Sequence, residues 1–380
     1  MISFTLSEHQ RELQQKFRET GELHLRPVAA EIDRAAPGPL DRRFLDILGS
    51  EGLISLLVPE EYGGQHVDAI TLAVIIEELG WASTDFAAVF QSTFHAVKTI
   101  LVGGSPEQKK RFLKELLAPS GRVAAFCPTE EQGGSDSSSF RTTARLSGDR
   151  YILNGEKTPV INAGSAAFYI VWANMDTDRG RSGINAFVVP GDTPGVTCGP
   201  YYDKSGHRGV PIATVTFDNV EVPKENLIGT PGSGYLLLMQ AVDSGRAFVG
   251  ASCVGLARAA LEIALEHAKK RTIKSRPIIS NQGVSFPLAD LLTHLEAARL
   301  LVWKACELMN AGLDHSAASS MAKLFASELA VRATSEGMLI LGQKSIHRSV
   351  LMEKLQRDAQ LTRIVEGTSH IQKAVISSQL

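Results

Sequence analysis

The first third of the chain carries apolar residues three or four positions apart, as on one face of an amphipathic helix. Leu6, Leu13 and Phe17 begin this pattern. Ser105, followed by Pro106 and Gln108, has the residue types of a helix start, because Gln108 can reach back to the capping serine. We predict further helices over residues 44–53, 70–79, 87–102 and 109–117. Residues 1–121 are therefore expected to form an N-terminal α-helical domain.

Near Gly121 the helical period ends. Short runs with β-branched or aromatic residues follow, separated by Gly, Asp, Asn and Pro, which is typical of short strands. We predict strands over residues 123–127, 142–146, 151–153, 169–173, 186–189 and 214–217, with a hairpin turn at 147–150. Residues 122–230 are therefore expected to form a small middle β-domain.

From Gly234 onward the apolar stripes are those of long helices. We predict helices over residues 236–270, 288–311, 317–341 and 350–361. Their lengths suit an up-and-down bundle, so residues 231–380 are expected to form a C-terminal helical bundle. The predicted fold class is α+β, in the order helices, strands, helices.

Composition narrows the function classes. The 380 residues exceed one ordinary core, and the net charge of −2 gives no electrostatic case for nucleic acid or an anionic membrane. The four cysteines are scattered without a CxxC pair, so we expect neither disulfides nor a metal site. We find no signal peptide and no apolar run that we expect to span a bilayer, so we predict a cytoplasmic protein.

Glu366 is the first candidate for chemistry. Ile364 and Val365 precede it, Gly367 permits a left-handed turn after it, and Thr368 can cap a helix over residues 369–378. A carboxylate among apolar neighbours has a raised pKa and is a stronger base. The alternative is a solvated first-turn residue that interacts with the helix dipole, and this stretch alone favours the alternative.

The wider motif around Glu366 changes that balance. Arg357-Asp358-Ala359 and Ile364-x-Glu366-Gly367-Thr368-x-x-Ile371-Gln372 resemble the C-terminal signature of the acyl-CoA dehydrogenases. The resemblance implies that Glu366 removes the α-proton of an acyl thioester while FAD accepts the β-hydrogen as hydride. It also implies three domains, helical, β and a C-terminal four-helix bundle, in the order predicted above.

Other motifs extend the resemblance. The stretch from Thr129 to Asp136 follows a predicted strand and resembles the family's Thr-Glu-Pro-x-x-Gly-Ser-Asp, with Glu131 in place of Pro. Without the resemblance, this stretch would be interpreted as a polar loop. The resemblance implies that FAD contacts Phe126, Thr129, Gly134, Ser135, Pro159, Ile161, Arg271, Gln282, Gly342 and Thr368. It implies that the acyl thioester contacts Ser135, Asp243, Arg246 and Gly367.

The pair Asp243 and Arg246 matches the family's Asp-x-x-Arg, which helps to place CoA and supports the catalytic region. The alternative is a surface ion pair between residues three positions apart. Gly245 stands where one branch of the family carries its base, and a glycine cannot serve as one. Glu366 is therefore the sole candidate base.

Several flavin motifs depart from the family pattern. Pro159 replaces an aromatic residue and Ile161 replaces a threonine whose hydroxyl approaches the flavin. Lys274-Ser275 replaces Phe-Gly, and only Gly342 survives of three glycines between Leu339 and Ile346, with side chains present at Gln343 and Ser345. Lys274, Arg276 and Lys344 add positive charge that could compensate by attracting a dinucleotide phosphate.

Three hypotheses follow. The leading one is an FAD-dependent dehydrogenase that introduces an α,β double bond into an acyl-CoA, passes electrons to an electron-transfer flavoprotein or similar carrier, and forms a dimer or homotetramer. The second is a relative that binds an acyl thioester without stable FAD, as a lyase, isomerase or structural subunit. The third keeps the dehydrogenase chemistry but takes the thioester from an acyl carrier protein.

Overall fold

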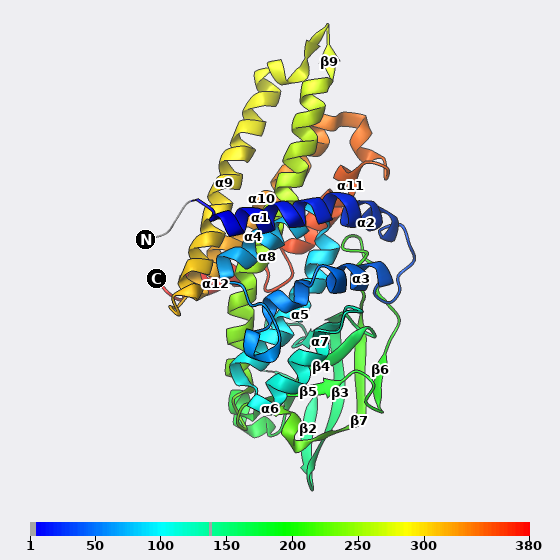
Figure 1. Ribbon diagram of the computed structural model, residues 1–380, viewed down its shortest axis with the longest axis vertical. Helices are drawn as coiled ribbons and strands as arrows, with labels where there is room; N and C mark the ends of the chain where they lie inside the picture. The colour runs from blue at the N-terminus through cyan, green and yellow to red at the C-terminus, as the bar shows by residue number, and fades with distance from the viewer. Residues whose placement is uncertain (1–4, 137–138) are drawn as a thin grey trace.

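The chain folds in the predicted order of helices, strands and helices (Figure 1). The computed structural model describes residues 5–136 and 139–380. The N-terminal helices are α1 (Glu8–Thr20), α2 (Arg26–Ile32), α3 (Arg42–Ser50), α4 (Ala69–Ala82), α5 (Thr84–Gly103), α6 (Pro106–Gln108) and α7 (Lys114–Leu116). Ser105 and Gln108 form the predicted capping box, and Ser7 and Gln10 form a second one. The α+β fold class is thus confirmed.

The middle of the chain forms one sheet in the order β6-β7-β3-β2-β4-β5-β8, with β1 parallel to β4. Its strands are β1 (Val123–Cys127), β2 (Thr143–Ser147), β3 (Arg150–Ile161), β4 (Ala166–Asn174), β5 (Ile184–Pro190), β6 (Val196–Cys198), β7 (Ile212–Pro223) and β8 (Leu227–Ile228). The predicted hairpin turn joins β2 and β3, where Ser147 pairs with Arg150. β6 and β8 were not predicted, because runs of two or three residues carry no period.

Side chains of β4 alternate between two cores, as the pleat of a strand requires. Ile170 and Trp172 pack with the helices, whereas Tyr169 and Val171 belong to the separate core of the β-domain. The Trp172 indole also donates a hydrogen bond to the Gly234 carbonyl oxygen at 2.9 Å. The sheet is therefore fixed to the first turn of the C-terminal bundle.

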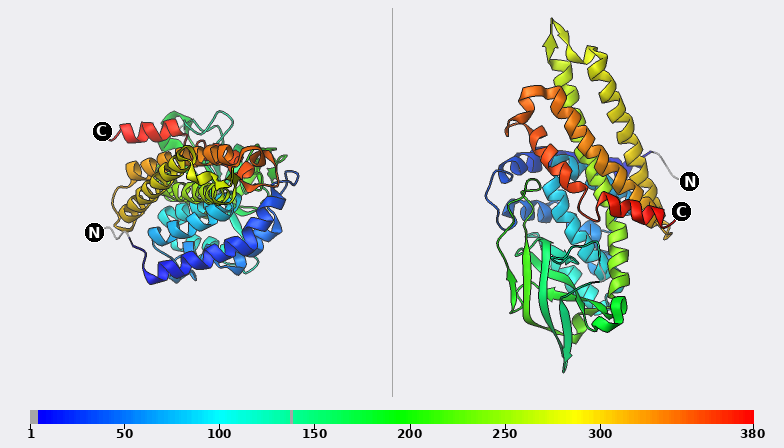
Figure 2. Two further views of the ribbon diagram at one scale, coloured as in Figure 1. Left: turned by 90° about the horizontal axis from the view of Figure 1, so that it is seen from above. Right: turned by 180° about the vertical axis from the view of Figure 1, so that it is seen from behind.

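The bundle contains α8 (Gly234–Lys270), α9 (Gln282–Asn310), α10 (Ser316–Leu341), α11 (Leu351–Thr362) and α12 (Ser369–Ser377). A short hairpin of β9 (Thr272–Ile273) and β10 (Arg276–Pro277) joins α8 to α9 at the end of the molecule far from the large sheet (Figure 1). α12 lies on the outside of the bundle (Figure 2). α9 begins six residues earlier than predicted, with Pro287 inside it.

α8 is the central helix of the fold. By length and composition it could cross a bilayer, but 72% of its most apolar stretch is buried inside the protein, as is typical of a core helix. An added Cβ on Gly255 would lie 2.1 Å from the Glu77 carbonyl oxygen, and one on Gly80 would lie 2.4 Å from the Ser252 carbonyl oxygen. Small residues therefore bring the backbones of α4 and α8 into contact.

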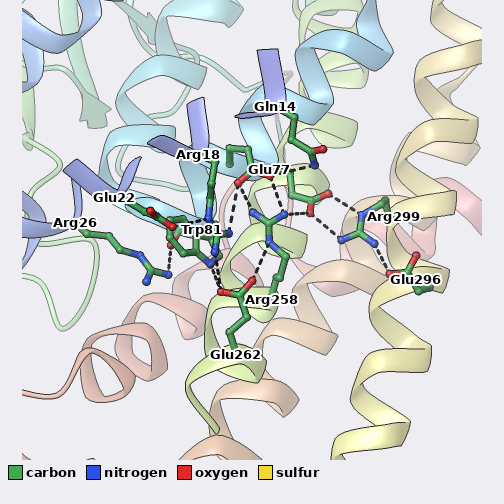
Figure 3. A network of polar contacts seen from close by, with 11 residues as sticks. Gln14, Arg18, Glu22, Arg26, Glu77, Trp81, Arg258, Glu262, Glu296 and Arg299 are labelled. Atoms are coloured by element: carbon green, nitrogen blue, oxygen red, sulfur yellow. Dashed lines mark hydrogen bonds and ion pairs between the residues drawn. The ribbon is translucent and has the colours of Figure 1, made fainter. Parts of the chain in front are cut away.

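A network of ion pairs crosses the same contact (Figure 3). Glu78 on α4 accepts hydrogen bonds from both Arg258 Nη atoms on α8, at 2.8 and 2.5 Å. The Trp81 ring lies between Arg18 and Arg26, whose guanidinium carbons are 3.1 and 3.2 Å from its centroid. The N-terminal domain is thereby joined to the bundle by charges that pair with each other inside a largely buried interface.

We expect Glu78→Ala to lower the free energy of unfolding by about 3 kcal/mol, because it leaves buried Arg258 partly uncompensated. Chemical denaturation would measure the change. Glu22→Ala is the control: Glu22 is 55% exposed and pairs with Arg18, and its loss should cost less than about 1 kcal/mol. Equal midpoints for Glu78→Ala and the parent protein would show that the network contributes nothing to stability.

Candidate active site

Glu366 lies in the predicted break between two helices. α11 ends at Thr362 and α12 begins at Ser369, after Thr368 caps it by accepting a hydrogen bond from the Ile371 backbone N–H at 3.3 Å. Between the helices, Glu366 and Gly367 both have left-handed backbone conformations, with φ of 56° and 88°. A left-handed non-glycine residue is strained and must be held by its surroundings.

Two buried side chains hold this turn. Gln372 Nε2 donates to the carbonyl oxygens of Glu366 and Gly367, both at 2.9 Å. Lys323 Nζ, from α10, donates to the Gly367 carbonyl oxygen at 2.8 Å. The backbone of the candidate base is therefore fixed from α12 and from α10.

The preceding motif residues Arg357 and Asp358 fix α11 to the other two domains. Arg357 forms a bidentate salt bridge with Asp33, with N–O distances of 2.7 and 2.9 Å. Buried Asp358 accepts hydrogen bonds from the Thr84 hydroxyl and from the His207 backbone N–H, each at 2.7 Å. This part of the motif thus sets the position of the helix that leads to Glu366.

The Glu366 carboxylate faces α5, where it meets His95. His95 Nε2 lies 3.2 Å from Glu366 Oε2, and His95 Nδ1 lies 2.7 Å from the Gln91 carbonyl oxygen. The imidazole is buried, and its centroid lies 4.9 Å from that of Phe126. Sequence analysis missed His95, because a single histidine within an apolar helix gives no signal of what faces it.

These charges reverse one expectation. Burial alone would raise the pKa of Glu366, but His95, Arg246 and Lys323 outweigh it and hold the pKa below its usual value. The prediction of a carboxylate with a raised pKa among apolar neighbours is therefore wrong. The alternative of a solvated first-turn residue is also wrong, because the side chain is only 20% exposed and lies before α12.

Gly245 and Arg246 on α8 complete the surroundings of Glu366. An added Cβ on Gly245 would lie 1.9 Å from His95 Nε2, so the imidazole occupies the space beside this glycine. Arg246 pairs with Asp243 at 2.5 Å, and its side chain is only 7% exposed. The alternative of a surface ion pair is therefore wrong.

The strand motifs of the β-domain meet each other near Phe126. The Thr158 backbone N–H donates to the Thr129 carbonyl oxygen at 2.9 Å, next to a buried ion pair of 2.7 Å between Glu130 and Lys157. Glu130 also accepts backbone hydrogen bonds from residues 141 and 142, and its pKa falls to about 2 because these partners outweigh burial. The loop that starts at Thr129 is thus anchored at its base.

The remaining residues of these motifs lie toward solvent. Gly134, Ser135 and Pro159 are exposed, and Ile161 is half-buried against the helical core. Pro159 lies on β3, where the sheet register shifts between Lys157 and Val160. The aromatic and hydroxyl groups that the family pattern supplies are absent at 159 and 161.

Arg271, Gln282 and Gly342 lie at the opposite end of the bundle. Arg271 lines a cavity of about 490 Å³ together with His267, Lys270 and Lys344. Burial first, then Lys344 and Arg271, lower the pKa of His267, as expected where positive charges converge. Ser345 is buried and donates to the Gly342 carbonyl oxygen at 2.8 Å, so its side chain turns inward.

Glu266 also lines this cavity and pairs with Lys270 at 2.5 Å, so Arg271 and Lys344 are the cations that fit the anionic part of a dinucleotide. Of the predicted compensating charges, Lys344 lines the cavity, whereas Lys274 and Arg276 lie on the exposed hairpin. One chain does not bring this cavity to Thr129, because the hairpin and the large sheet lie at opposite ends (Figure 1).

Comparison with known proteins identifies the chain. Three family models match in succession: the N-terminal domain of acyl-CoA dehydrogenase over residues 7–119, the middle domain over 125–220 and the C-terminal domain over 232–380. The protein belongs to the acyl-CoA dehydrogenase family. An acyl-CoA dehydrogenase from Bacillus subtilis is 38% identical over 96% of this chain and 95% of that protein.

Solved structures agree with the family. Butyryl-CoA dehydrogenase from Megasphaera elsdenii is 34% identical, with a TM-score of 0.95 over 99% of both chains. The prolyl acyl carrier protein oxidase AnaB is 28% identical, with a TM-score of 0.92 over 99% of both chains. PigA in complex with FAD is 27% identical, with a TM-score of 0.92 over 99% of this chain and 98% of that one.

Two predictions are thereby confirmed. As a member of the acyl-CoA dehydrogenase family, the protein is an oxidoreductase that acts on CH–CH groups. FAD is its cofactor. The roles of individual residues remain predictions.

We expect Gly245→Ala to displace His95 from Glu366 and to lower the free energy of unfolding by about 1–3 kcal/mol, because the added methyl group overlaps the imidazole. Chemical denaturation would measure the change. Gly283→Ala on α9 is the control, since no described atom lies within 4 Å of the added Cβ. A Gly245→Ala protein as stable as the parent would contradict this packing.

Proposed function

We propose that the protein introduces a double bond between the α and β carbons of an acyl thioester, with Glu366 as the base for the α-proton. The supporting observation is the position of Glu366. Its carboxylate is partly exposed, its backbone is held in a strained turn, and three positively charged groups keep it ionised. A base must be ionised and fixed before substrate binds, and Glu366 meets both conditions.

In the proposed reaction, the α C–H bond breaks and a bond forms between the proton and the Glu366 carboxylate. The thioester carbonyl oxygen then gains negative charge, which the Glu366 backbone N–H can stabilise as a hydrogen-bond donor. Bound FAD supplies the acceptor for the β-hydrogen. The proposed contacts of the thioester are Ser135, Asp243, Arg246 and Gly367.

The proposed FAD contacts lie in two separate regions of the folded molecule. Phe126, Thr129, Gly134, Ser135, Pro159, Ile161 and Thr368 lie on the side of Glu366, whereas Arg271, Gln282 and Gly342 lie at the far end of the bundle. These two groups lie far apart within a single chain. We therefore propose a homodimer or homotetramer in which two chains share each FAD. A cytoplasmic location and an electron-transfer flavoprotein as acceptor are further parts of this proposal.

CoA and an acyl carrier protein are both proposed carriers of the acyl group. The similarity to butyryl-CoA dehydrogenase favours CoA, and the similarity to AnaB favours a carrier protein. The exposed Pro159 and the missing hydroxyl at Ile161 favour weaker binding of FAD than the family pattern would give. The flavin spectrum reports whether FAD is bound, and the thioester that bleaches it distinguishes the two carriers.

We expect purified protein to show two visible flavin bands that an acyl-CoA or acyl carrier protein thioester bleaches under anaerobic conditions. Glu366→Gln should keep the bands and lose the bleaching, because the amide cannot accept the proton. Absorbance spectra with and without added FAD would measure both effects. Protein without flavin bands in excess FAD would contradict the proposed reaction.

We expect Arg271→Ala to lower the FAD content of purified protein by about tenfold, the equivalent of one charge-assisted hydrogen bond to a phosphate. FAD released by denaturation and measured against protein gives the ratio. Lys269→Ala is the matched control, since Lys269 is a nearby cation on α8 that does not line the cavity. Equal FAD loss in both variants would show that this cavity does not bind FAD.

A further inference from the structure

His95 is a buried imidazole that the proposed reaction does not use directly. It lies on α5, 1% exposed, with its ring beside Phe94 and Phe126. Gly245 on α8 leaves the space that the ring occupies. Packing therefore fixes the His95 ring, and in this position Nε2 lies against the carboxylate of Glu366.

The hydrogen bond at Nδ1 fixes the tautomer. His95 Nδ1 lies 2.7 Å from the Gln91 carbonyl oxygen, and a carbonyl oxygen only accepts hydrogen bonds. Nδ1 therefore carries a hydrogen. A neutral ring with its hydrogen on Nδ1 presents only a lone pair at Nε2.

That lone pair would face an acceptor. Nε2 lies 3.2 Å from Glu366 Oε2, a distance of an ion pair without the alignment of a hydrogen bond, and Nε2 has no other hydrogen-bond partner among the described residues. A lone pair against an ionised oxygen is repulsive. The contact is favourable only when one proton belongs to the pair, on the imidazole or on the carboxylate.

We propose that His95 is a positioning residue for Glu366, and that the two side chains hold one shared proton as an imidazolium beside a carboxylate. This inference rests on the proposed function, in which Glu366 is the base. The imidazolium keeps Glu366 ionised and directs one of its oxygens, so the base is ready at a lower pH than a buried carboxylate without this partner.

The other charged groups around the pair favour this distribution of charge. Arg246 from α8 and Lys323 from α10 face Glu366, with Asp243 paired to Arg246, and Glu328 and Cys253 near Lys323. Burial alone would lower the pKa of His95, but the Glu366 carboxylate and the Gln91 carbonyl raise it. Burial lowers the pKa of Lys323 to about 8, so Lys323 stays charged in neutral and acidic solution.

The pair also suits the reaction. When the carboxylate takes a proton from carbon, the imidazolium can stay charged beside the neutral acid. No second proton has to leave the buried site. His95 thus acts through Glu366, without contact with the reacting carbon.

The first test is the protonation state of His95. Protein labelled with ¹³C at histidine is titrated by NMR, and the His95 signal is assigned by its absence in His95→Gln. We expect the His95 midpoint to lie above the ordinary histidine value of about 6.5, because the Glu366 carboxylate favours the charged ring. In Glu366→Gln the midpoint should fall, because burial is then opposed by the Gln91 carbonyl without the carboxylate. A His95 that is neutral at pH 7 in both proteins overturns the proposal.

The second test is the pH dependence of kcat/KM below pH 7, where Lys323 stays charged. Glutamine at position 95 keeps a polar group but no titrating charge, so we expect His95→Gln to move the acidic limb upward by about one to three pH units. An acidic limb at the same pH in His95→Gln and in the parent protein overturns the proposal. A merely structural role would instead lower the whole profile equally.

His294→Gln is the matched control. His294 makes the same contact with a carbonyl oxygen four residues earlier, 2.7 Å to Asp290, but it is half-buried on α9 and has no carboxylate partner among the described residues. The acidic limb should be unchanged in this variant. The NMR titration needs no turnover, so a protein that fails as a dehydrogenase would still report whether His95 and Glu366 share a proton.

Discussion

A buried carboxylate must be compensated by positive charge, and this requirement connects the site to the whole fold. Three groups from three helices compensate Glu366: His95 from α5, Arg246 from α8 and Lys323 from α10. α5 belongs to the N-terminal domain, whereas α8 and α10 belong to the bundle. The candidate base is therefore correctly surrounded only when both domains are packed together.

The contacts that pack those domains follow the same logic. Glycines at positions 80 and 255 bring α4 and α8 into backbone contact, and paired charges such as Glu78 and Arg258 cross the interface. At the other side, Asp358 ties α11 to α5 and to the β-domain. Asp358, which belongs to the C-terminal signature, thus holds the helix that leads to Glu366 in place.

The sequence predicts what is local and fails where a property depends on distant neighbours. The capping box at Ser105 and the break around Gly367 were predicted, because each depends on adjacent residues. The pKa direction of Glu366 was wrong, since its main cause, His95, lies far away in the chain. The buried state of Arg246 was likewise decided by packing, and the short strands β6 and β8 carry too few residues for a pattern.

The central claim is that Glu366 takes a proton from the carbon next to a thioester. Exchange of that hydrogen in D₂O tests it most directly: flavin-loaded protein is incubated anaerobically with short acyl-CoA and acyl carrier protein thioesters, and deuterium is located by mass spectrometry. We predict deuterium at the α carbon with the parent protein and none with Glu366→Gln. Exchange at the same rate in both proteins would contradict the account.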